Sequence, residues 1–209
     1  MAEKESMPTK IHTAMLGAFF ALLCGCSLMP ERIDIQYDAQ SVVAIVPGAR
    51  NVRVQISDQR PDKSTVGTKE NGYGMMAPIL ANEDVAVTIR KAIEEELLAR
   101  GFQLGNEAAA VQIAGELTRF YNDHKKRIFS GGAVADMNML VTVRSKSGGL
   151  LFSKQIVAQA IGTHTWLMTG NNARVALDRV LENGMKMLFE DQAFIAAILT
   201  ASGSQPANQ

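Results

Sequence analysis

The chain has 209 residues, of which 47% are apolar and 20% charged, and its 21 basic residues balance its 21 acidic ones. This composition excludes an intrinsically disordered chain, which combines low hydrophobicity with high net charge. A formal charge of zero also argues against a nucleic-acid-binding protein, because such proteins normally carry a basic excess. Both cysteines, Cys24 and Cys26, lie near the N-terminus, so the rest of the chain has no disulfide framework.

Residues 1–25 are predicted to be a lipoprotein signal peptide. Two lysines precede an uncharged stretch at residues 14–24, whose 11 residues are too few to span a bilayer, which needs about 20. This length is typical of the apolar core of a secretory signal. Two glutamates ahead of it are unusual for such a signal, so translation from Met7 is an alternative to translation from Met1.

The end of this stretch, Leu23-Cys24-Gly25-Cys26, resembles a bacterial lipobox, in which a Leu, a small residue and a Gly precede the lipidated cysteine. Cys26 fits that position and is the predicted lipidation site. The alternative interpretation is an ordinary signal peptide with an incidental cysteine. Because Ser27 rather than Asp follows Cys26, the sorting rule of such lipoproteins predicts an anchor in the outer membrane, facing the periplasm.

The first part of the mature chain is predicted to contain a tether, two strands and a loop. Residues 26–40 lack a clear period and are expected to form the tether. Residues 41–46 are apolar and β-branched, and residues 51–56 alternate apolar and polar side chains, so both stretches predict strands. Residues 57–80 are rich in Gly, Asn, Pro and polar side chains and predict a long irregular loop.

A helix over residues 82–100 is predicted, because apolar residues recur there at helical spacing. Asn82 is the expected N-cap, and Glu83 and Asp84 suit the positive end of the helix dipole. Gly101 is expected to end the helix, since glycine readily adopts the left-handed conformation that follows many helices.

The remaining chain predicts three strands followed by two helices, with alternating side chains in the strands and a tight turn at residues 146–149. In chain order these elements are strands at 110–121, 133–143 and 150–161, a helix from about residue 171 and a helix at 191–199. Asn171 or Asn172 is the expected cap of the first helix, and residues 201–209 are expected to be a disordered tail.

These elements predict a single periplasmic α+β domain over residues 41–200, in the order β-β-α-β-β-β-α-α. The three consecutive strands favour a mainly antiparallel sheet, and two amphipathic helices can cover one face of such a sheet. We therefore expect a two-layer sandwich.

Residue types that carry catalysis or bind metals form no convergent pattern in the sequence. His124 and His164 are far apart and lack metal-ligand spacing, and no G-x-S-x-G nucleophile motif occurs. The consecutive acidic residues of the 82–100 helix point in different directions, so they cannot by themselves form a pair across a cleft. The sequence therefore predicts no catalytic residue, no metal site and no cofactor.

The long loop contains the residues best suited to contact a partner. Its Gly-rich part, residues 67–74, lacks the residue order of a phosphate-binding loop. Tyrosine and methionine amid these glycines are adaptable contact residues. The predicted partner-binding residues are Gln59, Arg60, Tyr73, Met75 and Met76. The alternative interpretation is a loop without a binding role, with the sheet face as the contact surface.

Several of these features together resemble the YajG-like family of small bacterial lipoproteins. They are the lipobox with Cys26, the strand end Ser57-Asp58-Gln59-Arg60, the helix end Leu97-Leu98-Ala99-Arg100-Gly101-Phe102 and the three strands that follow. The order of elements matches that family over nearly the whole mature chain. The resemblance implies an envelope lipoprotein, and it provides no catalytic residues to transfer onto this chain.

The sequence thus predicts an outer-membrane lipoprotein that is held by its lipid anchor, faces the periplasm and acts as a binding or adaptor module without catalysis. The expected partner is an envelope protein or peptidoglycan. Two alternatives remain open: an envelope enzyme that acts on murein or lipid, and a homo-oligomer that assembles as the ring component of an envelope complex.

Overall fold

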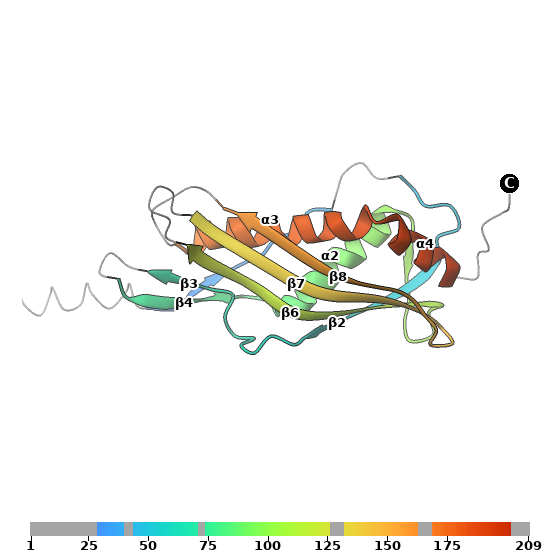
Figure 1. Ribbon diagram of the computed structural model, residues 1–209, viewed down its shortest axis with the longest axis horizontal. Coiled ribbons are helices and arrows are strands. Elements are labelled where there is room, and N and C mark those ends of the chain that lie inside the picture. The colour runs from blue at the N-terminus through green and yellow to red at the C-terminus, as the bar shows by residue number, and fades with distance from the viewer. Residues whose placement is uncertain (1–28, 40–43, 71–73, 126–131, 163–168, 202–209) are drawn as a thin grey trace, which may run out of the picture.

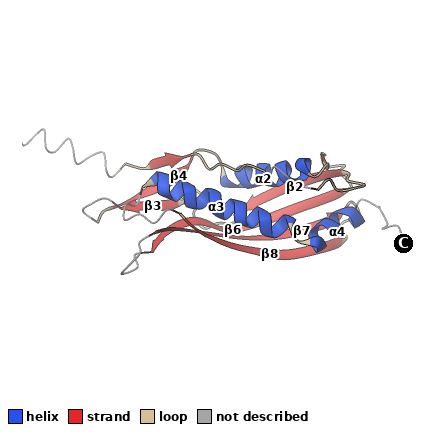
Figure 2. Ribbon diagram, turned by 90° about the horizontal axis from the view of Figure 1, so that it is seen from above, coloured by secondary structure: helices blue, strands red, loops and turns tan. Residues whose placement is uncertain are grey.

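The computed structural model describes residues 29–39, 44–70, 74–125, 132–162 and 169–201. Within these ranges eight strands form one mixed sheet, and three helices lie over the same face of that sheet (Figures 1 and 2). The predicted α+β class is confirmed, whereas the predicted element order and the mainly antiparallel pairing are only partly right.

The strands are β1 (Glu31–Ile33), β2 (Asn51–Asp58), β3 (Gly67–Glu70), β4 (Met76–Ala81), β5 (Gln103–Leu104), β6 (Val111–Lys125), β7 (Gly132–Ser145) and β8 (Leu150–Ile161). The helices are α2 (Val85–Ala99), α3 (Gly170–Phe189) and α4 (Gln192–Ala201). None of these described helices is both long and apolar enough to cross a membrane.

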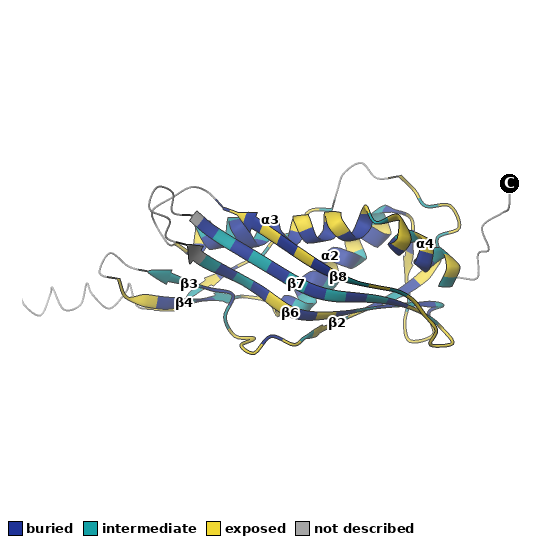
Figure 3. Ribbon diagram, viewed as in Figure 1, coloured by how far each residue is buried: buried dark blue, intermediate teal, exposed yellow. Residues whose placement is uncertain are grey.

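The antiparallel meander β6–β7–β8 is the part of the sheet that the sequence predicts best. β7 pairs with β6 on one side and with β8 on the other. Odd-numbered residues of β7 from Ala133 to Val143 are buried, and the even-numbered ones between them are partly exposed (Figure 3). This alternation places the predicted apolar face of β7 beneath α3 and α4.

The second edge of β6 has two partners in succession, which makes the sheet mixed. β2 pairs parallel with the first half of β6, from Val52↔Val111 to Asp58↔Leu117. The chain then leaves the sheet over residues 59–66 and returns as β3, which meets β6 in parallel at Gly67↔Asn122.

The predicted irregular loop at residues 57–80 is therefore wrong. β3 and β4 form an antiparallel hairpin within it, from Gly67↔Ile79 to Glu70↔Met76. Only β4 of the two carries a distinct apolar face, with Ala77 and Ile79 buried. Pairing with neighbouring strands, rather than an alternating pattern in β3, forms this hairpin.

Residues 26–40 are predicted to form a tether, but the described part of this segment, residues 29–39, belongs to the domain. β1 pairs parallel with β4, from Glu31↔Ile79 to Ile33↔Ala81. Tyr37 Oη donates a hydrogen bond of 2.5 Å to a carboxylate oxygen of Glu96 on α2. Of the strand predicted at residues 41–46, the described residues 44–46 are not in a strand.

The helix over 82–100 is confirmed with a different cap. Asp84, not Asn82, caps α2, and its Oδ1 accepts a hydrogen bond of 2.7 Å from the Ala86 amide. Gly101 follows the helix with φ of +89°, as expected for a residue that ends a helix in the left-handed conformation.

The two predicted C-terminal helices are confirmed as α3 and α4. Thr169, rather than Asn171 or Asn172, caps α3 by accepting a hydrogen bond from the Asn172 amide at 3.3 Å. On α4, Phe194 makes edge-to-face contacts with Phe152 of β8 and Phe189 of α3. The predicted tail lies outside the described residues from position 202 onward, as does the predicted signal peptide.

Candidate binding surface

The structure separates the predicted contact residues into two places. Gln59 and Arg60 begin the β2–β3 loop, whereas Met75 and Met76 lie at the far end of the β3–β4 hairpin. The four residues of β3 lie between the two places and span about 13 Å at a strand's rise of about 3.3 Å per residue. Tyr73 lies outside the described residues, as does Cys26.

Arg60 is 5% exposed, and its guanidinium is used inside the fold. Nε and Nη2 donate to the carboxylate of Asp58 at 2.8 to 3.1 Å. Nη1 donates to the carbonyl oxygens of Thr65 and Phe120, at 3.0 and 3.2 Å. Nη2 also donates to the carbonyl oxygen of Lys63 at 3.1 Å. Arg60 therefore fastens residues 59–66 to β6.

The pKa values of two carboxyl groups, Asp58 at the end of β2 and Asp62 in the loop, are lowered. Burial acts to raise the pKa of Asp58, but the hydrogen bonds and charge of Arg60 outweigh it and hold that pKa below the usual 3.8. Hydrogen bonds from Ser64 and Thr65 lower the pKa of Asp62 to about 2. Both groups thus favour the charged form and serve as fixed acceptors.

A hollow of about 280 Å³ lies between this loop and the middle of β6. Its lining includes Arg60 and Thr65 of the loop together with Arg119 and Tyr121 of β6. The Arg119 guanidinium lies 5.8 Å from the centre of the Tyr121 ring and 3.1 Å from a carboxylate oxygen of Asp136. The wall of the hollow is therefore held by internal contacts.

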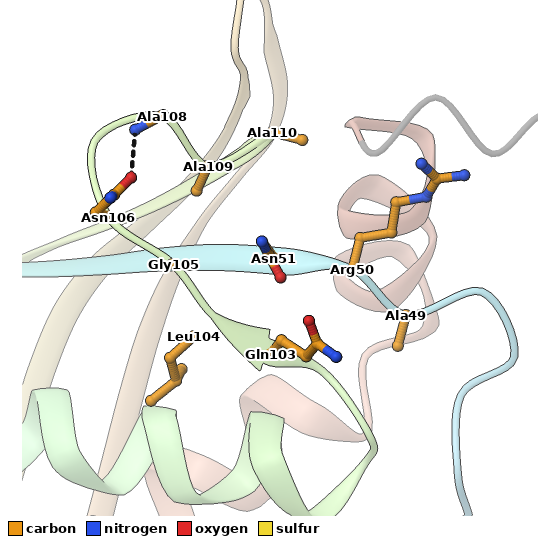
Figure 4. A pocket seen from close by; sticks show the side chains of 10 residues that line it. All are labelled: Ala49, Arg50, Asn51, Gln103, Leu104, Gly105, Asn106, Ala108, Ala109 and Ala110. Atoms are coloured by element: carbon orange, nitrogen blue, oxygen red, sulfur yellow. Dashed lines mark hydrogen bonds between the residues drawn. The ribbon is translucent and has the colours of Figure 1, made fainter.

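A cleft of about 850 Å³ lies at the opposite end of β2 (Figure 4). Its lining residues are Ala49, Arg50, Asn51, Gln103, Leu104, Gly105, Asn106, Ala108, Ala109 and Ala110. Among them Arg50 is the one ionisable side chain, and Asn106 accepts a hydrogen bond from the Ala108 amide at 2.9 Å. Such a lining suits a polar ligand and provides no acid–base pair.

The acidic residues of α2 and its cap pair with different partners. Glu94 pairs with Arg90 at 2.8 Å, and Glu83 pairs with Lys91 at 2.5 Å. Glu96 is 1% exposed and bonds to Arg100, whose guanidinium lies 4.5 Å from the centre of the Phe189 ring. Burial, followed by the hydrogen bond to Glu96, raises the pKa of Tyr37.

Within the described ranges no three or more His, Cys, Asp and Glu residues are grouped to hold a metal ion. Of the two histidines considered from the sequence, His164 lies outside the described residues, and only the backbone of His124 is described, as part of β6.

One surface that the sequence analysis did not single out is the outer edge of β8. Among the described strands β8 has a single neighbour, β7, over its 12 residues. Side chains of α3 cap two of its carbonyl oxygens, because Asn183 donates to Gln159 and Arg179 donates to Ile161, both at 3.0 Å. The carbonyl groups of Gln159 and Ile161 therefore point away from β7, toward the outer side of the strand.

From Phe152 to Ile161 the pairing of β8 with β7 is regular, and the outward side of the strand carries no charged side chain. Backbone N–H and C=O groups alternate along a strand, so the residues two, four and six positions before Gln159 face the same way. They are Val157, Gln155 and Ser153, and all three have exposed side chains. β8 contains no proline, and its one charged side chain, Lys154, bonds to Asp191 at 2.6 Å beside α4. Strand edges in proteins are normally blocked by proline, charge or a covering segment.

Comparison with known proteins gives a family and a fold. Residues 40–199 match the model of a family described as an uncharacterized lipoprotein. Protein XCC0632 from Xanthomonas campestris has a similar structure, with a TM-score of 0.56 at 10% identity over 86% of this chain and 99% of that one. A minor lipoprotein from Acinetobacter baumannii aligns at a TM-score of 0.40 and 8% identity, over 68% and 94%. No curated protein gives a significant sequence match.

Proposed function

The chain belongs to this lipoprotein family, in accord with its likeness to the YajG-like lipoproteins, and from that premise we propose that it is a lipid-anchored binding module. Cys26 is the proposed site of acylation, and the outer membrane, on its periplasmic side, is the proposed location. One acyl chain holds a protein only reversibly, whereas several make the anchor stable. The proposed activity is contact with an envelope partner, without catalysis.

The part of the β8 edge before Gln159, with which no other described strand pairs, carries the proposal. Ser153, Gln155 and Val157 direct their backbone donors and acceptors away from β7, and none of the three side chains is charged. An added strand would satisfy these groups, and the side chains on alternate positions would select it. We therefore propose that the partner is an envelope protein that supplies an extended segment.

The side chains on the open face of the sheet fit this kind of partner. Val157 is 60% exposed on this face, and Leu151, 41% exposed, lies at the register shift near the start of β8. Val157 provides an apolar contact, while Ser153 and Gln155 at the preceding alternate positions provide polar ones. The edge thus offers both apolar and polar contacts to an added strand.

The residues predicted from the sequence have different places in this proposal. Gln59, Met75 and Met76 are exposed and stay proposed contact residues, as does Tyr73. Arg60 supports the loop that carries Gln59, because its donors are occupied within the fold.

Photo-crosslinking in cells tests the proposed edge. A photoreactive residue at position 157 of the full-length lipoprotein is expected to give a discrete protein adduct. The matched control is position 98 on α2, because Leu98 is similarly exposed, at 52%, and lies on another element. Equal adducts from both positions, or an adduct at position 98 alone, would contradict binding at the β8 edge. An adduct with peptidoglycan fragments would instead assign the polymer as partner.

The anchor is tested separately. The proposal expects the N-terminal peptide of the mature protein to begin at Cys26 and to carry acyl chains, as measured by mass spectrometry. A Cys26→Ala variant is expected to leave the outer-membrane fraction. A mature N-terminus at another residue, without acylation, would overturn the proposed anchoring.

A further inference from the structure

The direction of β1 determines which end of the domain lies near the proposed lipid anchor. β1 runs parallel to β4, with Glu31 opposite Ile79. The chain that precedes Glu31 therefore leads from the side of β4 on which Met76 lies. Met76 is three residues before Ile79, which corresponds to about 10 Å along the strand.

The connection between Cys26 and β1 is too short to separate the domain from the membrane. Five residue steps join Cys26 to Glu31, and a fully extended chain covers at most about 18 Å in that number. The 15 residues of β6 span about 50 Å by comparison. The end of the molecule that carries the β3–β4 hairpin is thus the end near the anchor, and α4 lies at the opposite end (Figure 1).

This anchored end exposes three methionine side chains. Met29 is 62% exposed, Met75 40% and Met76 51%. Flexible thioether side chains suit an irregular apolar environment such as the boundary between lipid head groups and acyl chains. We name these three residues the methionine tip.

The charges beside the methionine tip limit how deeply it can enter a bilayer. Lys69 neutralises Glu31 at 3.2 Å. Glu70 lies opposite Met76 across the hairpin, so its carboxylate is close to the tip. A carboxylate is costly in hydrocarbon, which confines the contact to the depth of the head groups.

We infer that the methionine tip rests on the bilayer that holds the lipid anchor, and that the β3–β4 hairpin is a second membrane contact. The inference rests on the proposed function, since it uses acylation at Cys26. It gives the proposed contact residues Met75 and Met76 a lipid surface as the surface that they contact. The β8 edge is then left for the protein partner, because Leu150 begins that strand at the end remote from the anchor.

Site-specific fluorescence on the acylated protein tests the inference. Once residues 1–25 are removed and Cys26 is acylated, an introduced cysteine is the only free thiol. An environment-sensitive dye is attached to Met76→Cys or, as the matched control, to Leu98→Cys, which is exposed to the same degree at the other end. Each protein is reconstituted into vesicles of phosphatidylethanolamine and phosphatidylglycerol, with or without brominated acyl chains.

The emission of the dye at position 76 is expected to shift to the blue and to be lowered by brominated lipid, as for a group at the head-group boundary. The dye at position 98 should respond to neither. Flotation of the vesicles is measured on the same samples. Protein that floats while both dyes behave alike would overturn the methionine tip alone. Protein that fails to float would overturn the proposed anchor and the inference with it.

Discussion

Arg60 shows how one residue fixes an irregular segment without regular secondary structure. The side chains of Arg60 and Asp58 are 5% and 7% exposed, so their ion pair is almost completely removed from water. A buried pair is stable only when further hydrogen bonds satisfy its remaining donors, and here backbone carbonyl oxygens do so. The pair therefore joins the β2–β3 loop to the middle of the sheet.

Replacing Arg60 by alanine is expected to lower the free energy of unfolding by about 3–5 kcal/mol, because it leaves a buried carboxylate without its partner. The neighbouring Gln59→Ala variant is the control, since Gln59 is exposed and a change there is expected to stay within about 0.5 kcal/mol. Urea denaturation measures both values. Equal stabilities of the two variants would contradict the role assigned to Arg60.

Asp58 should make the stability depend on pH in a defined direction. Because the pKa of Asp58 is lowered in the folded protein, its contribution is present above the unfolded value of about 3.8 and is lost as the pH falls through the folded value. The stability gap between wild type and Asp58→Asn is therefore expected to narrow on going from neutral pH to about pH 3. Denaturation curves at several pH values measure this gap, and a constant gap would contradict the prediction.

The helix caps show what local sequence patterns can and cannot predict. Asn82, Glu83 and Asp84 all fit an N-terminus, and the sequence correctly predicts the helix. The choice among them depends on β1, which is distant in sequence. The Asn82 amide donates to the Ile33 carbonyl at 2.9 Å and its side chain to Asp34 at 2.6 Å, so the cap moves to Asp84. The same limit applies to Arg60. The sequence places it at a strand end and predicts a contact residue, but it does not reveal that the side chain is buried.

At the scale of the elements, β6 is packed between β2 and β7 with no spare room at Gly115. A Cβ atom there would lie 2.6 Å from Cδ1 of Ile56 and 3.0 Å from Sδ of Met139. Ile56 lies on β2 and Met139 on β7, so side chains on both neighbouring strands would have to shift. Because Gly115 has no side chain, the side chains of Ile56 and Met139 can occupy the space above it.

The Gly115→Val variant is expected to lose about 1–3 kcal/mol through overpacking, although valine favours strands. Ala114→Val is the matched control, because Ala114 is the preceding residue and points to the opposite, partly exposed face. Thermal unfolding compares the two. A control that is destabilised as much as Gly115→Val would show that the effect does not come from packing at Gly115.

Strands with an alternating pattern could be predicted from the sequence, and strands that depend on distant pairing could not. β6, β7 and β8 are long and joined in succession, so local alternation predicts them. β1 has only 3 residues and pairs with β4, which is distant from it in the chain. β3 has only 4 residues and pairs with β4 across a turn. The parallel pairing of β2 with β6 is also non-local, because α2 and β5 lie between them. The sequence consequently predicts more antiparallel pairing than the sheet contains.

The two sides of β8 should respond differently to proline. Gln155→Pro removes an N–H group that faces outward, whereas Ile156→Pro removes one that faces β7. We expect the first variant to keep its cooperative unfolding and the second to lose about 3 kcal/mol or more. Circular dichroism with heating measures both. Loss of folding in Gln155→Pro would contradict the assignment of the outer edge.

At the scale of the whole molecule, the proposed anchor and the proposed binding edge lie at different places. With acylation at Cys26, the short connection would hold the hairpin end near the bilayer, and β8 extends from that end, where Ile161 pairs with Val134, toward the remote end. A partner strand added to β8 would therefore extend away from the membrane surface. The anchor and the binding role stay predictions from the sequence, whereas the candidate edge becomes visible only when the strand order is known.

The central claim is that a partner strand adds to the outer edge of β8 in the anchored protein. The most direct measurement is photo-crosslinking from position 157 in cells that carry either the wild-type edge or the Gln155→Pro edge. The account predicts a discrete protein adduct with the wild-type edge and its loss with Gln155→Pro, at equal protein levels and with both proteins in the outer membrane. An adduct of unchanged yield in Gln155→Pro would contradict strand addition at β8.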